Sequence, residues 1–548
     1  MNAEHLLTLY GRVSEAPNVI ARLRRFVLDL AVRGKLVAQD VGDEPASELL
    51  KRIAAEKARL VKAGKIRRDN SASLTPPDQH MFPVPNSWVW VPATFPAHGV
   101  SDLGKKIKTK DVLEAGAFPV VDQGKVLVRG YCDDPEKAIK VTNPMIVFGD
   151  HTRETKLIDF DFVVGADGVK LLQPLCIEAS YYFLALQWLP LDSRGYGRHF
   201  KLLKASTLPL PPLAEQRRIV AKVAELMALL DRLEAARTAR EATRDRVTTA
   251  SLARLTAPDT DPAEFPDNAR FALATLPALT TRPDQIKPLR QTILNLAVRG
   301  KLVEQDPSDE TASELLKRIA VEKAQLEKEG SVRKQKPAAE VTQKERSFST
   351  PPNWDWARLV AIGQTQTGNS PSSSKPELFG SHIPFIKPAD LDGSSISYDG
   401  PGLSPTGMDY SRVAPANSVL MVCIGATLGK VNVTDRQACF NQQINSVTPF
   451  LDGMHGFLSL ALKSPVFQEL AWSRAGTGTL PIISKGKWEV LPIPLPPLAE
   501  QHRIVAKVDA LMALCDRLEA ALTTADTTRA RLLEALLHEA LDPAAATA

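Results

Sequence analysis

The stretch PLPPLAEQRRIVAKV at 209–223 returns almost unchanged as PLPPLAEQHRIVAKV at 494–508. From 208 to 236, 24 of 29 positions match the residue lying 285 positions further along the chain. Apolar residues then recur at alternating spacings of four and three, the a/d pattern of helices that pair as coiled coils. The pattern predicts two long amphipathic helices, in paired coiled coils or in an ordinary helical bundle. Their seam residues are Ile219, Val223, Leu226, Leu230 and Leu233, and Ile504, Val508, Leu511, Cys515 and Leu518.

A second repeat precedes the first. LAVRGKLV at 30–37 recurs at 296–303, and 28 of 38 positions from 27 to 64 match the residue 266 further on. The change of offset from 266 to 285 means that the second half holds 19 extra residues between its repeated blocks. Each half of the chain therefore has two repeated helical blocks, which together we call the frame. Between them lies a segment that differs between the two halves, which we call the middle.

The middles alternate apolar residues with Gly and Asp turns, which indicates compact, mostly β domains. The expected fold class is α+β: two mixed, mostly β domains separated by two long antiparallel coiled-coil regions, with a pseudo-twofold internal repeat. The expected segments are an N-terminal helical region 1–80, a β domain 81–208, a central helical region 209–346 with a linker at 255–285, a second β domain 347–493 and a C-terminal helix 494–548.

Shorter helices are expected at 18–36 and 47–64 with their copies, and late in each β domain at 179–189 and 456–473. An antiparallel hairpin of 215–253 with 285–303 is predicted. By repeat symmetry, helix 18–36 should pack against the C-terminal helix 500–540 and close the chain head to tail.

The composition of the chain argues against a membrane-spanning protein and a secreted protein. The 548 residues carry a net charge of +5, contain no long apolar run and begin without a secretory signal pattern. The five cysteines form no CxxC pair, so free buried thiols in the cytoplasm are expected and a zinc site is not. Residues 81–207 hold 15 Lys/Arg against 14 Asp/Glu, and residues 347–492 hold 10 of each. If these two segments contact DNA, they would therefore do so through local clusters of basic and polar side chains and not through an overall basic surface.

Several loops are candidates for contact with DNA. KKIKTK at 105–110 suits phosphate but is equally a solvated loop, and the amides of FNQQIN suit adenine but also cap strands. GNSPSSSK at 368–375 is a polar loop or a plain linker. The glycine-flexed stretches SRGYGRHFK at 193–201 and AGTGTLPIISKGK at 475–487 occupy matching places. The candidate residues are Lys105, Lys106, Lys108, Lys110, Gln123, Lys125, Arg129, Arg153, Arg194, Tyr196, Arg198, His199 and Lys201, then Ser370, Lys375, Lys387, Gln442, Gln443, Asn445, Arg474, Thr477, Thr479, Ser484, Lys485 and Lys487.

Catalytic motifs are missing. The sequence has no GxxxxGK[ST], GxGxxG after a strand, HExxH or GxSxG, and no Asn/Asp-Pro-Pro-aromatic tetrapeptide. Asp150, Glu154 and Lys156 resemble the acid and acid-x-Lys signature of metal-dependent nucleases. A stand-alone endonuclease is therefore one alternative, and a coiled-coil scaffold with two carbohydrate- or peptide-binding β domains is another.

The doubled PLPPLAEQxRIVAKV element and the LAVRGKLV element resemble the specificity subunit of type I restriction–modification enzymes, over essentially the whole chain. The resemblance implies a non-catalytic subunit whose two target recognition domains each read half of an asymmetric bipartite site in double-stranded DNA. It implies antiparallel coiled coils that set the unread spacer. It also implies two modification subunits with S-adenosylmethionine and two motor-nuclease subunits with ATP and Mg²⁺, with no cofactor on this chain.

Overall fold

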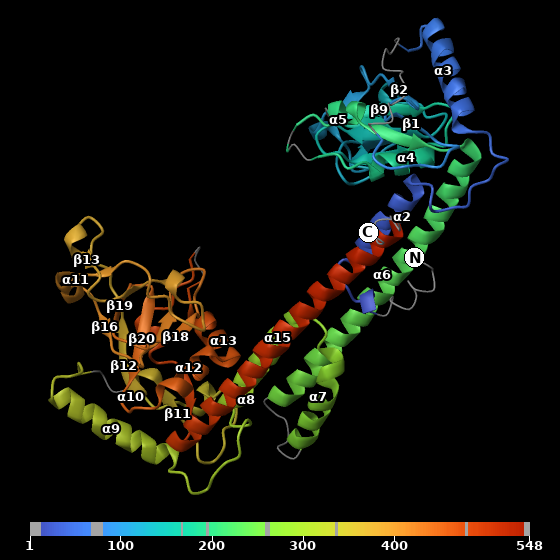
Figure 1. The fold of residues 1–548 in the computed structure, drawn as a ribbon. Helices are drawn as coiled ribbons and strands as arrows, with labels where there is room; N and C mark the ends of the chain where they lie inside the picture. Colours follow the sequence, from blue (N-terminus) through green and yellow to red (C-terminus); the bar gives the residue numbers. More distant parts are fainter. Residues whose placement is uncertain are drawn as a thin grey trace. The chain divides into compact units, whose positions relative to one another are not determined.

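A computed structural model describes residues 12–66, 80–165, 168–192, 195, 197–257, 264–334, 338–476 and 480–541. Helices and strands are mixed throughout (Figure 1). The chain divides into two compact units, of which the first is Met1–Arg240 with Asp526–Ala548 and the second is Glu241–Ala525. Among the helices of these described ranges, none combines the length and apolarity needed to cross a bilayer.

Two four-stranded sheets make up the β domain of the first unit. One has the order β2-β9-β6-β7 with every pair antiparallel, and the other has the order β3-β8-β4-β5 with β3 and β4 parallel to β8. Strand β6 is buried along its whole length because it lies between two partners. The strands are β2 (Ala97–Val100), β3 (Lys106–Ile107), β4 (Phe118–Val121), β5 (Gly130–Cys132), β6 (Met145–Gly149), β7 (Thr155–Ile158), β8 (Val163–Gly165) and β9 (Val169–Pro174).

The β domain of the second unit repeats the first of these sheets. Its order β12-β20-β17-β18 is again first strand, last strand and then a hairpin, all antiparallel. A three-stranded sheet β14-β19-β16 and the pair β13-β15 complete the domain. The strands are β12 (Gly363–Thr367), β13 (Phe379–Gly380), β14 (Phe385–Ile386), β15 (Gly402–Leu403), β16 (Val413–Ala414), β17 (Val419–Val422), β18 (Val431–Val433), β19 (Ala438–Phe440) and β20 (Ile444–Pro449).

The two chain ends of each β domain pair with each other. Strand β1 (Val89–Pro92) lies antiparallel to β10 (Thr207–Leu210), and β11 (Asp355–Arg358) lies antiparallel to β21 (Pro492–Leu495). The prolines of β10 and β21 are tolerated because each ribbon has only two strands, so every strand is an edge. The chain therefore enters and leaves each β domain at one place, the two-stranded ribbon that its first and last strands form.

Two 44-residue helices follow these ribbons, α6 (Leu213–Thr256) and α15 (Leu498–Leu541). Each begins directly after a Pro-Pro pair, and proline is compatible with a helix start. The first two seam residues of each helix are buried. Leu518 is 38% exposed, so the prediction that it belongs to a packed seam is wrong.

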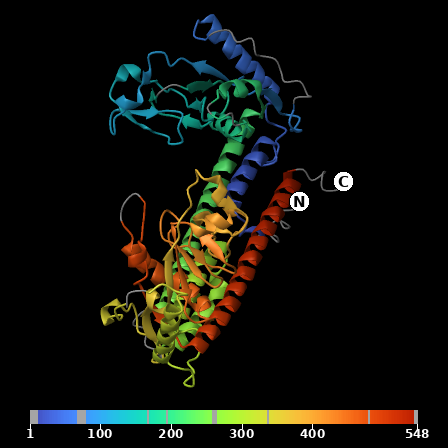
Figure 2. The same cartoon turned by 90° about the vertical axis from the view of Figure 1, so that its left-hand side faces the viewer.

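The predicted contact of the N-terminal helix with the C-terminal helix is confirmed inside the first unit. Helix α2 (Val19–Val32) lies between the start of α6 and the end of α15 (Figures 1 and 2). Arg24 bonds Asp231 at 2.5 Å, and Arg22 pairs with Glu534. Helix α3 (Ala46–Lys62) confirms the helix expected at 47–64.

The predicted linker 255–285 differs from the structure, since α7 spans Phe265–Leu279 within it. Helix α8 (Ile286–Val298) then begins beside Asp245, with Gln285 Nε2 donating to that carboxylate at 2.9 Å, and its leucines join the cluster of Leu255 near the end of α6. Helix α8 therefore runs in the same direction as α6. The predicted antiparallel hairpin is wrong because α7 supplies the return.

The remaining predicted helices follow the predictions with one difference. Helices α4 (Ala179–Trp188) and α9 (Ala312–Lys328) form where expected. The helix predicted at 456–473 is two helices, α12 (His455–Lys463) and α13 (Pro465–Arg474), because Ser464 caps α13 and accepts a bond from Phe467 N at 3.3 Å. All five thiols are free, but Cys176 is exposed where a buried thiol was expected. Four short helices complete the description: α5 (Phe200–Ala205), α10 (Leu359–Ile362), α11 (Pro405–Asp409) and α14 (Lys485–Trp488).

Candidate nucleic-acid interface

Two loops of the first β domain are bonded to each other at one edge. They are the β4–β5 loop, 122–129, and the β6–β7 loop, 150–154. Thr152 Oγ1 donates to the Gln123 carbonyl at 2.5 Å, and the His151 amide donates to Gln123 Oε1 at 3.2 Å. The candidate Gln123 therefore joins the two loops, and its side-chain oxygen is already used.

The segment before α5 joins the same edge. Arg153 Nη1 donates to the Leu191 carbonyl at 2.6 Å, and the His199 amide donates to the Asp150 carbonyl at 2.7 Å. His199 is 1% exposed and its Nδ1 lies 2.9 Å from that carbonyl. The prediction of His199 as a DNA contact is therefore wrong, because its ring anchors the loop from inside.

Two lysines of the predicted run 105–110 are bonded to neighbouring groups of the protein. Lys105 donates to the Glu136 carbonyl, and Lys106 Nζ lies 3.3 Å from Asp102. Arg194 and Tyr196 lie outside the described residues. Besides Lys106, the exposed candidate cations of the first β domain are Lys108, Lys110, Lys125, Arg129, Arg153, Arg198 and Lys201.

The nuclease-like triplet does not form a catalytic site. Lys156 is buried and donates to the carbonyls of Asp122 at 2.8 Å and Val126 at 2.6 Å, and burial lowers its pKa. Asp150 Oδ1 accepts the backbone N–H of Phe200. Over the ranges that the structure describes, no three His, Cys, Asp or Glu side chains are grouped as metal ligands. Lys156 and Asp150 hold loops, so the triplet gives no support to metal-dependent cleavage.

Four segments gather at the corresponding edge of the second β domain. The β17–β18 loop meets the β19–β20 loop through Cys423 N and the Gln443 carbonyl at 2.8 Å. It meets the segment before α14 through Gly425 N and the Pro481 carbonyl at 3.0 Å. The polar loop 368–375 joins them, since Asn369 N donates to Phe440 O at 3.1 Å. The loop is part of this edge and not a plain linker.

The amides of FNQQIN separate into exposed and buried groups. Gln442 is exposed, and its Oε1 accepts a bond from Ser370 Oγ at 2.6 Å. Gln443 is half-buried and accepts a bond from Asn441 Nδ2. Asn445 is 2% exposed and accepts Thr367 Oγ1 at 2.8 Å. The prediction of Asn445 as a base contact is wrong, because it lies inside strand β20.

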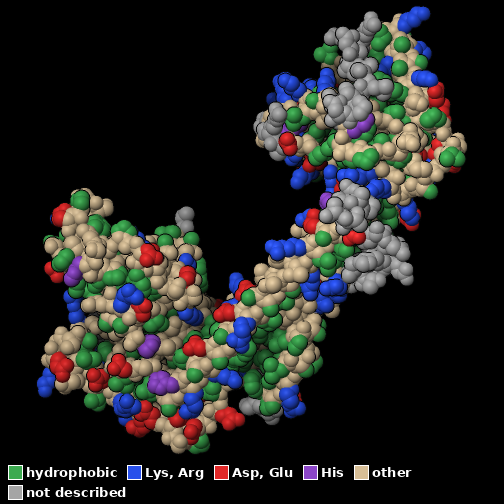
Figure 3. Space-filling model, in the orientation of Figure 1, with side chains coloured by type: hydrophobic (Ala, Val, Ile, Leu, Met, Phe, Trp, Pro, Cys, Tyr) green, Lys and Arg blue, Asp and Glu red, His purple; other side chains and the backbone are tan. Residues whose placement is uncertain are grey.

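The lysines at the loop edge of the second β domain also fall into bonded and exposed groups. Lys485 is paired with Glu489, and Lys487 Nζ lies 3.4 Å from the Arg474 carbonyl. Thr477 and Thr479 lie outside the described residues. The exposed candidates here are Ser370, Lys375, Lys387, Gln442, Arg474, Ser484 and Lys487. On the face of the second unit in Figure 3, basic and acidic side chains are interspersed, as the equal counts lead one to expect.

A set of contacts that the sequence did not single out anchors each β domain to its long helix. Trp88 Nε1 donates to Glu215 Oε2 at 2.8 Å in the first unit, and Trp354 Nε1 donates to Glu500 Oε2 at 2.9 Å in the second. Trp354 repeats Trp88 at the offset of 266, and Glu500 repeats Glu215 at the offset of 285, the two offsets of the repeated blocks. Their recurrence in both halves was the signal that could have found them.

Comparison with known proteins gives a consistent result. The family model for the type I restriction modification DNA specificity domain matches residues 351–525. The EcoAI specificity subunit of a type I restriction enzyme from Escherichia coli is 31% identical, over 95% of this chain and 94% of its own length. The chain belongs to the type I restriction enzyme specificity subunits. The EcoEI specificity subunit of Escherichia coli is 30% identical over 95% of this chain and 94% of its own length.

A solved structure from work on assembly and conformational transition of the type I R-M system covers 84% of this chain and 99% of its own, with 21% identity and a TM-score of 0.48. As a specificity subunit, the chain supplies DNA sequence recognition to a restriction–modification complex and not catalysis.

Proposed function

We propose that the β domains at 81–207 and 347–492 each read one half of an asymmetric, bipartite DNA site. One observation carries the proposal: a sheet of the same strand order recurs in both domains, while the loops at its edge differ in chemistry. The β6–β7 loop 150–154 is DHTRE, in which every side chain except the threonine is charged or titratable, whereas the β17–β18 loop 423–430 is CIGATLGK, whose single charged residue, Lys430, donates to the Leu391 carbonyl at 2.8 Å. Different loops on a common scaffold suit two different half-sites.

The contacts with DNA fall into two kinds. Exposed cations such as Lys125, Arg129 and Lys375 suit phosphate oxygens, which hold the subunit without reading sequence. Gln442 suits a base edge, because an amide can pair with the two groups that adenine presents in the major groove. Each edge therefore combines positioning and reading groups.

The long helices α6 and α15, with the shorter helices packed on them, set the unread spacer in this proposal. A seven-residue deletion shortens an α-helix by about 10 Å, which corresponds to about three base pairs of duplex. Deleting one heptad within 215–250 should therefore change the spacer and leave both half-sites intact. A deletion variant that changes a half-site sequence would contradict this assignment.

The subunit works with two modification subunits and two motor-nuclease subunits in this proposal. S-adenosylmethionine, ATP and Mg²⁺ then belong to those partners, in keeping with the missing nucleotide and methyltransferase motifs of this sequence. The repeated helical blocks offer two copies of one docking surface, which suits two copies of one partner.

Domain exchange tests the proposal. Both ends of the first β domain lie in the β1–β10 ribbon, so residues 81–207 can be replaced with another recognition domain at one junction. Mapping of methylated adenines in cells that carry the chimera and the modification subunits should show one changed half-site and one unchanged. A change in both halves, or in neither, would overturn the two-reader assignment.

A further inference from the structure

The first turn of each long helix holds a buried carboxylate. Glu215 in α6 and Glu500 in α15 are each 1% exposed. Both oxygens of Glu215 are used, since Trp88 Nε1 donates to Oε2 at 2.8 Å and Gln39 Nε2 donates to Oε1 at 2.6 Å. The carboxylate therefore links the helix to two separate segments, one of which leads directly into strand β1.

The second unit builds the same arrangement from its own residues. Glu500 accepts bonds from Trp354 Nε1 at 2.9 Å and from Gln305 Nε2 at 2.6 Å. These distances agree within 0.1 Å with those of the first unit, although the two β domains that follow Trp88 and Trp354 differ in sequence. The arrangement therefore serves the frame and is independent of which DNA sequence each domain reads.

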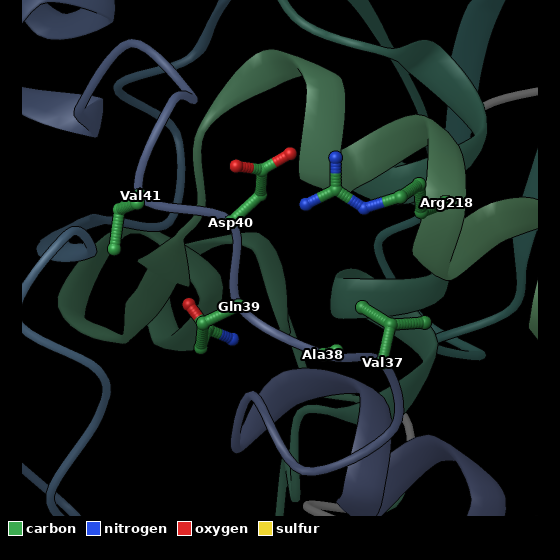
Figure 4. A pocket seen from close by; sticks show the side chains of 6 residues that line it. All are labelled: Val37, Ala38, Gln39, Asp40, Val41 and Arg218. Atoms are coloured by element: carbon green, nitrogen blue, oxygen red, sulfur yellow. The ribbon is translucent and has the colours of Figure 1, made fainter.

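An ion pair one helical turn later braces each carboxylate. Arg218 binds Asp43 with contacts of 3.2 and 2.6 Å, and Arg503 binds Asp309 with contacts of 3.2 and 2.7 Å. Arg218 also lines an open hollow of about 420 Å³ beside the segment 37–41 (Figure 4). The Gln39 that bonds Glu215 lies on this segment, so the ion pair and the hydrogen bond hold the same piece of chain.

Burial of a carboxylate is costly, and an apolar contact would hold a helix to a strand at lower cost. Burial raises the pKa of Glu215 and of Glu500, while the indole and amide donors oppose that rise. What two directed hydrogen bonds add is a fixed rotation of the tryptophan-bearing ribbon about the helix. A rotational setting matters for a reader that must face one groove of a helical duplex.

We propose that Glu215 and Glu500 are positioning residues that fix the rotational setting of each recognition domain on its long helix, and so enforce a single spacer length. The inference rests on the proposed two-reader function. The carboxylates touch no DNA in this account. They act through Trp88 and Trp354, which lead directly into strands β1 and β11.

The test uses the full-length chain with its modification subunits in cells, carrying Glu215→Gln or Trp88→Phe. Glu215→Gln leaves a single acceptor oxygen, which cannot serve both Trp88 and Gln39, and Trp88→Phe removes the indole N–H while keeping an aromatic ring. Methylated adenines are mapped at sites with the native spacer and at sites one base pair longer or shorter. The ratio of off-spacer to native-spacer methylation should rise at least tenfold, while both half-site sequences stay unchanged. Glu500→Gln and Trp354→Phe should raise the same ratio by loosening the second recognition domain on α15.

The matched control is Glu225→Gln on the exposed face of α6, where the carboxylate contacts Lys222 at 2.9 Å; its ratio should equal that of the unmodified chain. The double variant Glu215→Gln with Trp88→Phe should be no worse than the poorer single variant, because both changes act on the same Trp88–Glu215 contact. A uniform fall in methylation with an unchanged ratio would reduce these residues to stability alone and overturn the inference. Absence of any bipartite motif with the unmodified chain would instead overturn the proposed function.

Discussion

The two recognition domains share the strand order of one sheet but differ in the loops of that sheet. The strand orders β2-β9-β6-β7 and β12-β20-β17-β18 are equivalent, yet the hairpin loops that close them are DHTRE at 150–154 and CIGATLGK at 423–430. In the first domain, side chains such as Gln123 and Arg153 bind the loops together. In the second domain, backbone groups of Cys423 and Gly425 and the side-chain bond from Ser370 to Gln442 do so. The comparison shows that loop position is maintained by different means, which leaves loop chemistry free to vary.

The largest effect is expected from a change at the loop edge of the second β domain. Gln442→Ala should cost about 1–3 kcal/mol of discrimination at one base pair, which is about 5- to 150-fold, because it removes an amide suited to adenine. Binding to duplexes that vary one position at a time would measure the loss. Ser370→Ala keeps the amide and should have a smaller effect. Altered discrimination in the half-site of the first domain would contradict the assignment.

The frames, in contrast, should respond alike. Arg218→Ala and Arg503→Ala should each lower stability by about 1–3 kcal/mol, since each leaves a mostly buried aspartate without its partner. Thermal unfolding of the two variants should show losses equal within about 0.5 kcal/mol. Lys222→Ala, on an exposed part of α6, is the control. Clearly unequal losses would break the equivalence of the frames.

Salt dependence separates exposed from paired cations. Lys125→Ala or Arg129→Ala should each reduce the slope of log K against log salt by about 1, because each removes one phosphate contact. Lys485→Ala should leave the slope nearly unchanged, since Lys485 is already paired with Glu489. Binding titrations at several salt concentrations provide the measurement. An equal change in slope for Lys485→Ala would place that lysine on DNA.

The smallest effect concerns acid stability of the second unit. Glu345 accepts the backbone N–H of Thr342 at 2.9 Å, and this bond, with further bonds from the Thr342 hydroxyl and Arg358, lowers its pKa to about 2. Its contribution is therefore complete above the unfolded pKa of about 4.5 and is lost as the pH falls toward 2. Glu345→Gln should cost about 1 kcal/mol or less at pH 7. Unfolding measured from pH 7 to pH 2 should show the variant and the unmodified chain converge. A difference that grows in acid would have the wrong sign.

Periodicity and repetition predicted the long helices, the mostly β character of the middles and the contact of α2 with α15. They did not predict α7, because Pro, Thr and Asp at 255–285 suggested a linker, while packing of Ala272 with Leu252 and Leu255 stabilises a helix there. The direction of α8 was wrong for the same reason. Local propensity is a weak guide where tertiary contacts decide.

At the candidate interface, residue type predicted chemistry but not exposure. His199, Asn445 and Lys156 have side chains suited to DNA or catalysis, yet all three are buried. Their partners lie far away in the sequence: Asp150 is 49 residues from His199, and Asp122 is 34 from Lys156. Spacing along the chain contains no information on such pairs.

The sequence by itself determined the doubled frame, because 24 of 29 and 28 of 38 repeated positions impose the same helices twice. It also determined that the middles differ, and hence that two different surfaces are presented. Only the tertiary structure decided that the middles share a sheet order, which polar side chains face outward, and that Glu215 and Glu500 bond the tryptophans at the domain boundaries. The physical reason is that helix periodicity is encoded within a few turns of chain, whereas burial and hydrogen-bond partners depend on segments that meet only after folding.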